Sequence, residues 1–147
     1  MVLGGYTAGL GDDLRIRVVS VAEAFEDRGF AVTYEQGSDG GVAGPGAADQ
    51  SAAVAAAAKS DLAVVVIGTM ACTCCGQCAN GEAGDRDSEF DPEGNQLALL
   101  AAVLKATAGT KTKVVVVLVH GRPVTFGGVA GDKLLLGGDG IPGVDAL

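Results

Sequence analysis

Residues 62–67 read Leu-Ala-Val-Val-Val-Ile, a continuous apolar run that ends at Gly68. Residues 114–119 read Val-Val-Val-Val-Leu-Val and form a second run of the same length, which ends at His120. Strands that are buried on both faces of a parallel sheet show such unbroken runs, whereas half-exposed strands alternate apolar and polar residues. The two runs therefore predict strands of a parallel sheet that is covered on both faces.

Helical patterns surround these two strands. Apolar residues at helical spacing predict a helix over residues 12–28, and the alanine-rich stretch 47–60 predicts a second helix. A third helix is predicted to start with Asp91 as its N-cap and Pro92 at its first helical position, and to stop at Gly109. Helices thus alternate with strands along the chain.

Residues 30–34, Phe-Ala-Val-Thr-Tyr, predict a further strand. The resulting order of strand, helix, strand, helix, strand is typical of a doubly wound α/β sheet, in which ligands bind outside the carboxyl ends of the strands. Both the long connection 68–91 and the segment that begins at His120 follow carboxyl ends. We therefore expect both segments to leave from the same edge of the sheet.

Length and charge exclude several classes of protein. The chain has 147 residues, which suits one domain and is too short for an eight-stranded β/α barrel of roughly 250 residues. Its net charge of -8 disfavours nucleic acid and anionic membranes as partners. No apolar run approaches the roughly 20 residues of a spanning helix, and the N-terminus shows neither a basic n-region nor an apolar h-region.

The connection 68–91 contains the acidic stretch 82–89, Glu-Ala-Gly-Asp-Arg-Asp-Ser-Glu. A carboxylic acid can act as a general acid near neutral pH when burial or a like charge raises its pKa, and Glu82 is the candidate. The alternative is that these residues form a solvated loop of an acidic protein. Charge alone leaves both interpretations open.

Several short motifs together resemble the C-terminal domain of glycoside hydrolase family 3, because they occur in that family's order and at about its spacing. They are Leu3-Gly4-Gly5-Tyr6, residues 34–39 (Tyr-Glu-Gln-Gly-Ser-Asp), Ser60-Asp61 with the strand to Gly68, Glu82-x-x-Asp85-Arg86, Pro92-x-Gly94-Asn95-Gln96-x-x-Leu99, His120-Gly121-Arg122-Pro123-Val124 and Val144-Asp145-Ala146-Leu147. The resemblance implies a three-layer α/β sandwich with a mostly parallel sheet. It also implies that residues 1–147 are a partial domain, truncated at both ends and without the family's N-terminal β/α barrel.

The resemblance further implies a role in a retaining, exo-acting β-glycosidase that removes terminal β-glucosyl or β-xylosyl residues. In this family the barrel carries the nucleophilic aspartate, and the sandwich domain covers the sugar site. Glu82 matches the acid/base position, and Asp85 and Arg86 match the motif that shapes its loop. No cofactor or metal is needed when carboxyl groups play both catalytic roles. The isolated chain is therefore expected to be inactive, and the alternative is a non-catalytic remnant or a carbohydrate-binding domain.

His120 and Arg122 are candidates for residues near the substrate. The alternatives are a hydrogen-bonded residue at a strand end for His120, the only histidine, and a salt bridge for Arg122. A nucleotide site is not expected, because no Gly-x-Gly-x-x-Gly or Gly-Lys-Ser/Thr motif occurs.

Four cysteines lie within seven residues, at Cys72, Cys74, Cys75 and Cys78. Disulfides that tighten the loop beside Glu82 are the favoured interpretation, with free thiols and a metal site as alternatives. A secreted, cell-wall or vacuolar location is favoured over a cytoplasmic one, and the sequence leaves the compartment open.

Overall fold

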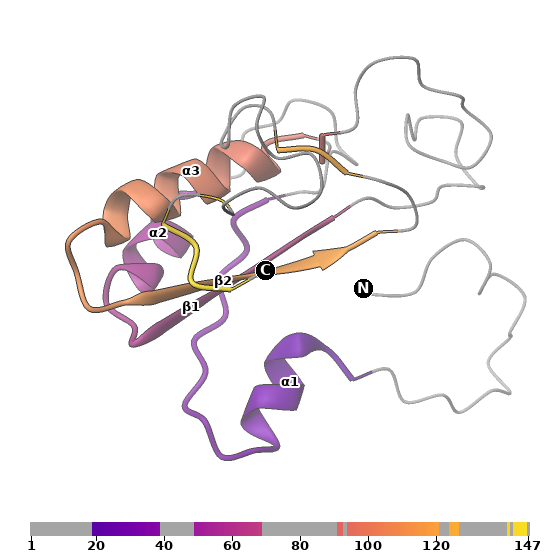
Figure 1. Cartoon of the computed structure of the whole chain (residues 1–147). Coiled ribbons are helices and arrows are strands. Elements are labelled where there is room, and N and C mark those ends of the chain that lie inside the picture. The colour runs from indigo at the N-terminus through magenta and orange to yellow at the C-terminus, as the bar shows by residue number, and fades with distance from the viewer. Residues whose placement is uncertain are drawn as a thin grey trace, which may run out of the picture.

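The computed structural model describes residues 19–38, 49–68, 91–92, 94–120, 124–126, 141 and 143–146. In chain order the elements are α1 (Val21–Glu26), α2 (Ser51–Ala57), β1 (Leu62–Gly68), α3 (Gln96–Thr107) and β2 (Lys113–Val119). In Figure 1, α2 and α3 lie together on one side of the two strands, and α1 lies on the other side. The order of helices and strands confirms the expected α/β fold class.

The two strands form a parallel pair in which Leu62 faces Lys113 and Gly68 faces Val119. On the other side of β2 runs a short piece of chain, Val144 to Ala146, which bridges Val115 in the parallel sense. The N–H of Val116 donates to the carbonyl of Ala146 at 2.9 Å. β2 therefore lies between β1 and this C-terminal segment, and every strand contact in the described residues is parallel.

The core lies between this sheet and the helices α2 and α3. Every second residue of each strand points toward the helices, and α3 faces the sheet with a stripe at helical spacing. The buried apolar residues are Ala57, Ala63, Val65, Ile67, Leu99, Leu100, Val103, Val114, Val116, Phe126 and Ile141. These apolar side chains pack closely, and their burial supplies the main favourable term for folding.

The prediction that both faces of the strands are covered is wrong for the described residues. On β1, Leu62 is 39% exposed and Val66 is 46% exposed, while the residues between them are buried or half-buried. The cause is that α2 and α3 cover one face only, and α1 contributes no buried residue to the other. An unbroken apolar run thus marked a strand correctly but did not report its burial.

The first predicted helix begins later than expected. Ser20 has an extended backbone and caps α1, because its hydroxyl accepts the N–H of Glu23 at 3.1 Å while the Glu23 carboxylate accepts the N–H of Ser20 at 2.8 Å. The prediction of one continuous helix over 12–28 is therefore wrong at Ser20, and residues 12–18 lie outside the described residues.

The strand predicted at residues 30–34 is wrong as well, because this stretch forms no ladder in the described residues. Phe30 is 57% exposed and Tyr34 is 74% exposed. Phe30 instead packs edge-on against Phe25 of α1, with ring centroids 5.4 Å apart. A β-like composition gives a strand only where another strand offers pairing groups.

The helix α3 begins four residues after the predicted first position. Its N-cap is Asn95, and Gly94 has a positive φ of 67°, which interrupts the helical path from Pro92. Asp91 is not the N-cap of α3, and its carboxylate accepts a hydrogen bond from the Thr125 hydroxyl. The predicted stop is confirmed, since Gly109 has a φ of 76° directly after the C-cap.

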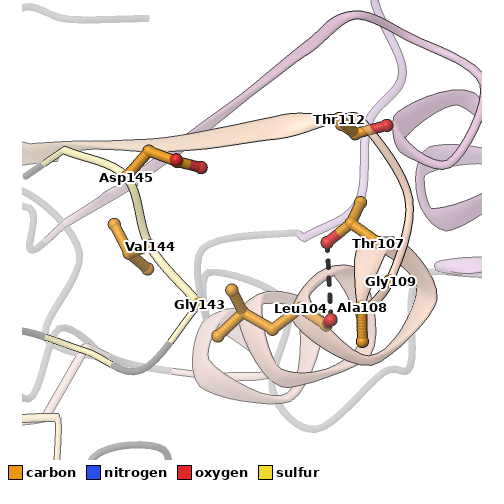
Figure 2. Close-up of a pocket in the computed structure, with 8 residues that line it drawn as sticks. All are labelled: Leu104, Thr107, Ala108, Gly109, Thr112, Gly143, Val144 and Asp145. Carbon is orange, nitrogen blue, oxygen red and sulfur yellow. Dashed lines mark hydrogen bonds between the residues drawn. The ribbon is translucent and has the colours of Figure 1, made fainter.

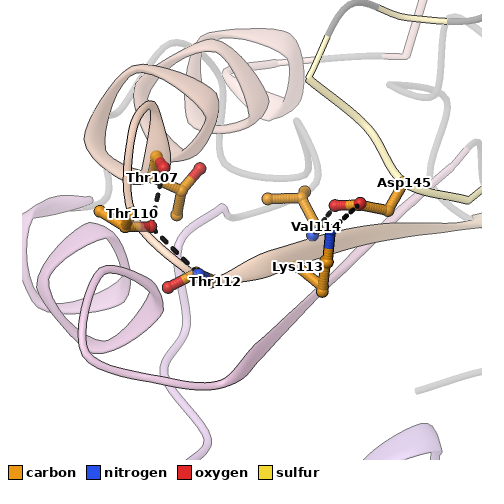
Figure 3. A network of polar contacts seen from close by, with 6 residues as sticks. All are labelled: Thr107, Thr110, Thr112, Lys113, Val114 and Asp145. Atoms are coloured by element: carbon orange, nitrogen blue, oxygen red, sulfur yellow. Dashed lines mark hydrogen bonds and ion pairs between the residues drawn. The ribbon is translucent and has the colours of Figure 1, made fainter.

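Asp145 secures the C-terminal segment to the start of β2 (Figure 3). Its carboxylate accepts a hydrogen bond from the backbone N–H of Val114 at 2.8 Å and forms an ion pair with Lys113 at 3.0 Å. The backbone N–H of Asp145 donates to the Val114 carbonyl. The Val114 N–H, with a smaller contribution from Lys113, lowers the pKa of Asp145. The stabilisation is therefore present above the ordinary pKa of an aspartate and is lost as the pH falls through the lowered value.

We expect Asp145→Asn to be less stable than the parent at neutral pH and to lose less stability on acidification. The isosteric amide keeps one acceptor for the Val114 N–H but removes the charge that Lys113 and this N–H stabilise. Urea unfolding of both proteins between about pH 7 and pH 3 measures the difference. Glu35→Gln, at an exposed carboxylate outside this network, is the control; parallel pH profiles for Asp145→Asn and the parent would contradict the assignment.

Candidate functional site

The carboxyl ends of β1 and β2 lie side by side, because Gly68 pairs with Val119 in the parallel register. The connection that follows Gly68 and the segment that begins at His120 therefore leave from one edge of the sheet, as the sequence predicted. His120 is exposed at this edge. We call the edge formed by Gly68, Val119 and His120 the carboxyl edge.

Gln96, the first residue of α3, is bound to the last residue of β1 through both ends of its side-chain amide. The N–H of Gly68 donates to Oε1 of Gln96 at 2.7 Å, and Nε2 of Gln96 donates to the carbonyl of Gly68 at 2.8 Å. Gln96 is only 5% exposed and continues the buried stripe of α3. Its amide therefore satisfies the last peptide groups of the strand, much as a neighbouring strand would.

The residue before it, Asn95, joins two further segments to the same edge. The Ser38 hydroxyl donates to Oδ1 of Asn95 at 2.6 Å, and Nε2 of Gln50, the N-cap of α2, donates to the Asn95 carbonyl at 3.1 Å. Nδ2 of Asn95 is buried and finds no hydrogen-bond partner among the described residues. The start of α3 is thus the point where the ends of several segments meet.

Gly37 allows Ser38 to reach this point. A Cβ at Gly37 would lie 2.6 Å from both terminal methyls of Leu99 and 3.1 Å from the Cβ of Ala53. The backbone therefore passes so close to α2 and α3 that a side chain at this position would require Leu99 to shift. This close approach gives a physical reason for glycine in the Tyr-Glu-Gln-Gly-Ser-Asp motif of residues 34–39.

The far end of the long connection is also fixed from the β2 side. Asp91 accepts a hydrogen bond from Thr125, which lies shortly after the carboxyl end of β2. Pro92 and Phe126, the neighbours of these two residues, are both buried. The chain that leaves β1 and the chain that leaves β2 are therefore held together at the carboxyl edge.

Most of the predicted site residues lie outside the described residues, and their positions remain predictions. These are Glu82, Asp85, Arg86, Arg122, Cys72, Cys74, Cys75 and Cys78. The structure describes the residues that flank them, which are Gly68 and Gln96 around the long connection and His120 and Val124 around Arg122.

A shallow hollow of about 420 Å³ lies at the opposite end of the strands (Figure 2). The C-terminal end of α3 and the segment from Gly143 to Asp145 line it. Its single carboxylate, Asp145, is already bound to Lys113 and Val114. A hollow with one committed carboxylate lacks the pair of carboxyl groups that glycoside hydrolysis requires.

Two further searches cover only the described part of the chain. There, no group of three or more His, Cys, Asp or Glu side chains is arranged to hold a metal ion. No helix in the same ranges is long and apolar enough to cross a membrane.

The sequence did not predict the hydrogen bonds that Gln96 and Ser38 make at the carboxyl edge. Gln96 lies three and four residues before Leu99 and Leu100 on the apolar stripe of α3. A glutamine at a buried position of a stripe needs a polar partner, and this pattern could have indicated a backbone contact. The partner of Ser38 lies 57 residues away and leaves no local signal.

Comparisons with known proteins agree with the arrangement of the elements. The family model described as "Glycosyl hydrolase family 3 C-terminal domain" matches residues 1–133. Neither a curated protein nor a solved structure gives a match.

Proposed function

The chain belongs to glycosyl hydrolase family 3, whose C-terminal domain it matches over residues 1–133, and from this membership we propose that it supplies the acid/base residue, Glu82, of a retaining β-glycosidase. The observation that carries the proposal is the hydrogen-bonded pair of Gly68 and Gln96 at the carboxyl edge. The connection that contains Glu82 begins after Gly68 and ends at Gln96, and these two residues are hydrogen-bonded to each other. Ligands of parallel α/β sheets bind at this edge.

In the proposed reaction a carboxylate of the barrel attacks the anomeric carbon while the Glu82 carboxyl gives its proton to the departing glycosidic oxygen. Water then attacks the covalent intermediate, and Glu82 takes a proton from that water. Two carboxyl groups about 5–5.5 Å apart are typical of this double displacement. A chain that supplies only the proton-transferring carboxyl is therefore one half of the catalytic pair.

The proposed substrates are glycosides that end in β-linked glucose or xylose. The barrel would form most of the pocket around the sugar ring, and the carboxyl edge of this domain would lie over it. Asp85 and Arg86 are proposed to hold the Glu82 loop, and His120 and Arg122 to lie near the substrate. Disulfides among Cys72, Cys74, Cys75 and Cys78 would stiffen the same connection.

We expect the isolated 147-residue chain not to hydrolyse aryl β-glycosides, because the attacking carboxylate is missing. Turnover is expected when residues 1–147 follow a β/α barrel of the same family in one polypeptide, which we call the joined protein. Release of nitrophenol from aryl β-glucosides and β-xylosides measures this. A folded joined protein that binds sugar without turnover would favour a carbohydrate-binding domain, and turnover by the isolated chain would contradict the division of roles.

A further inference from the structure

We propose that Gln96 is a positioning residue for the acid/base, because its side-chain amide closes the base of the connection that carries Glu82. The inference rests on the proposed function for the role of Glu82 and on the described contacts for the role of Gln96. In the sequence, Gln96 is only one residue of the motif Pro92-x-Gly94-Asn95-Gln96, and the motif gives its side chain no role.

The geometry is that of a closed pair of hydrogen bonds. The side-chain carbonyl of Gln96 accepts the Gly68 N–H at 2.7 Å, and its amino group donates to the Gly68 carbonyl at 2.8 Å. Only a group with an acceptor and a donor on one plane makes both bonds to one residue. The pair lies in a nearly dry place, since Gln96 is 5% exposed, and breaking it would leave peptide groups of Gly68 without partners there.

The Gln96 side chain projects from a helix end that other described residues hold in place. Gln96 starts the twelve-residue helix α3, whose next buried residues, Leu99 and Leu100, pack into the core. Asn95 beside it receives hydrogen bonds from Ser38 and Gln50. The side chain therefore projects from a fixed helix end toward a fixed strand end, and this preorganisation makes the contact effective.

Glu82 lies fourteen residues after Gly68 and fourteen residues before Gln96. The hydrogen-bonded pair joins the two ends of this stretch, so the connection leaves and returns through one point. A connection closed at its base samples fewer conformations than one with separated ends. The contact thus restricts how the two described ends of this connection, Gly68 and Gln96, lie relative to each other.

The test uses Gln96→Glu and Gln96→Leu in the full 147-residue chain. A protonated carboxyl group reproduces both hydrogen bonds, because its carbonyl oxygen accepts the Gly68 N–H and its O–H donates to the Gly68 carbonyl. A carboxylate has no donor and faces that carbonyl with a negative charge. Leucine offers neither bond at any pH. Thr107→Val, at the other buried polar residue of α3, is the matched control, because its hydroxyl contacts Val103 and not Gly68.

The readout is the hydrogen-exchange protection factor of the Gly68 amide, with core amides of β2 as the internal reference. At pH 8 we expect Gln96→Glu to lower the protection of Gly68 about tenfold, the size expected for one or two lost hydrogen bonds. At pH 5 the protection should return to within about threefold of the parent, while Gln96→Leu stays low at both pH values. Unchanged protection in Gln96→Leu, or no recovery of folded Gln96→Glu at pH 5, would overturn the proposal.

Kinetics of the joined protein separate positioning from general stability. We expect Gln96→Leu to lower kcat about 10- to 100-fold with KM changed less than about threefold, since a small displacement of an acid/base residue affects the chemical step. A matching loss in Thr107→Val would show a nonspecific effect of destabilising α3. The exchange experiment does not involve Glu82, so it can succeed even if the proposed function fails, and the reverse also holds.

Discussion

In the joined protein, Glu82→Gln is expected to lower kcat/KM about 100- to 10,000-fold for glycosides with poor leaving groups, which is the usual contribution of a general acid. The same change should lower kcat/KM less than about tenfold for dinitrophenyl glycosides, because their leaving group departs without a proton. The substitution is isosteric and removes only the transferable proton. Steady-state kinetics on a series of aryl glycosides of rising leaving-group pKa measure the difference.

The matched control is Glu89→Gln, a carboxylate of the same acidic stretch to which no catalytic role is assigned. It should leave kcat/KM within about twofold of the parent on every substrate, because the proposed proton donor is unchanged. Equal loss on good and poor leaving groups in Glu82→Gln would reassign the acid. A larger effect in Glu89→Gln than in Glu82→Gln would move the role along the same connection.

Gly68→Ala is expected to destabilise the chain by about 3 kcal/mol or more, at the severe end of single substitutions. A Cβ at this position would lie 1.8 Å from the carbonyl oxygen of Val119 and 2.7 Å from its carbonyl carbon. These are backbone atoms of the paired strand, so no change of rotamer relieves the clash and the strands must separate at the carboxyl edge. Urea unfolding of the 147-residue chain gives the loss in free energy.

Gly29→Ala is the control for the destabilisation expected in Gly68→Ala. Gly29 has a φ of 86°, yet nothing lies within 4 Å of a Cβ built there. Its cost is limited to backbone strain of about 1–2 kcal/mol. Similar losses of unfolding free energy for the two variants would contradict the expected clash between a Cβ at position 68 and the backbone of Val119.

The sequence predicted the elements best where one stretch carried its own signal. The valine-rich runs predicted β1 and β2 because an unbroken apolar stretch between breakers is compatible with few other structures. Gly109 predicted the end of α3 because a residue at positive φ is needed there. Local chemistry failed at Asp91 and Pro92, whose pattern suits a helix start, because the positive φ of Gly94 interrupts the helical path before Asn95.

The sequence predicted that the candidate site lies at the carboxyl edge, but it did not predict the contacts that the residues make there. Parallel strands made it certain that the chain after Gly68 and the chain from His120 would share an edge. The amide of Gln96 and the hydroxyl of Ser38 act through partners 28 and 57 residues away, and no spacing rule reports such contacts. Glu82 itself was identified through the resemblance, since its charge alone also suits a solvated loop.

The measurement that tests the central claim most directly is trapping of the glycosyl intermediate in the joined protein that carries Glu82→Ala. Without this carboxylate no base activates water, and no negative charge repels an anionic nucleophile, so azide should replace water at the anomeric carbon. We predict that azide accelerates turnover of a dinitrophenyl β-glycoside and gives the β-glycosyl azide, with retained configuration. Turnover that azide leaves unchanged, with no glycosyl azide formed, would contradict Glu82 as the acid/base.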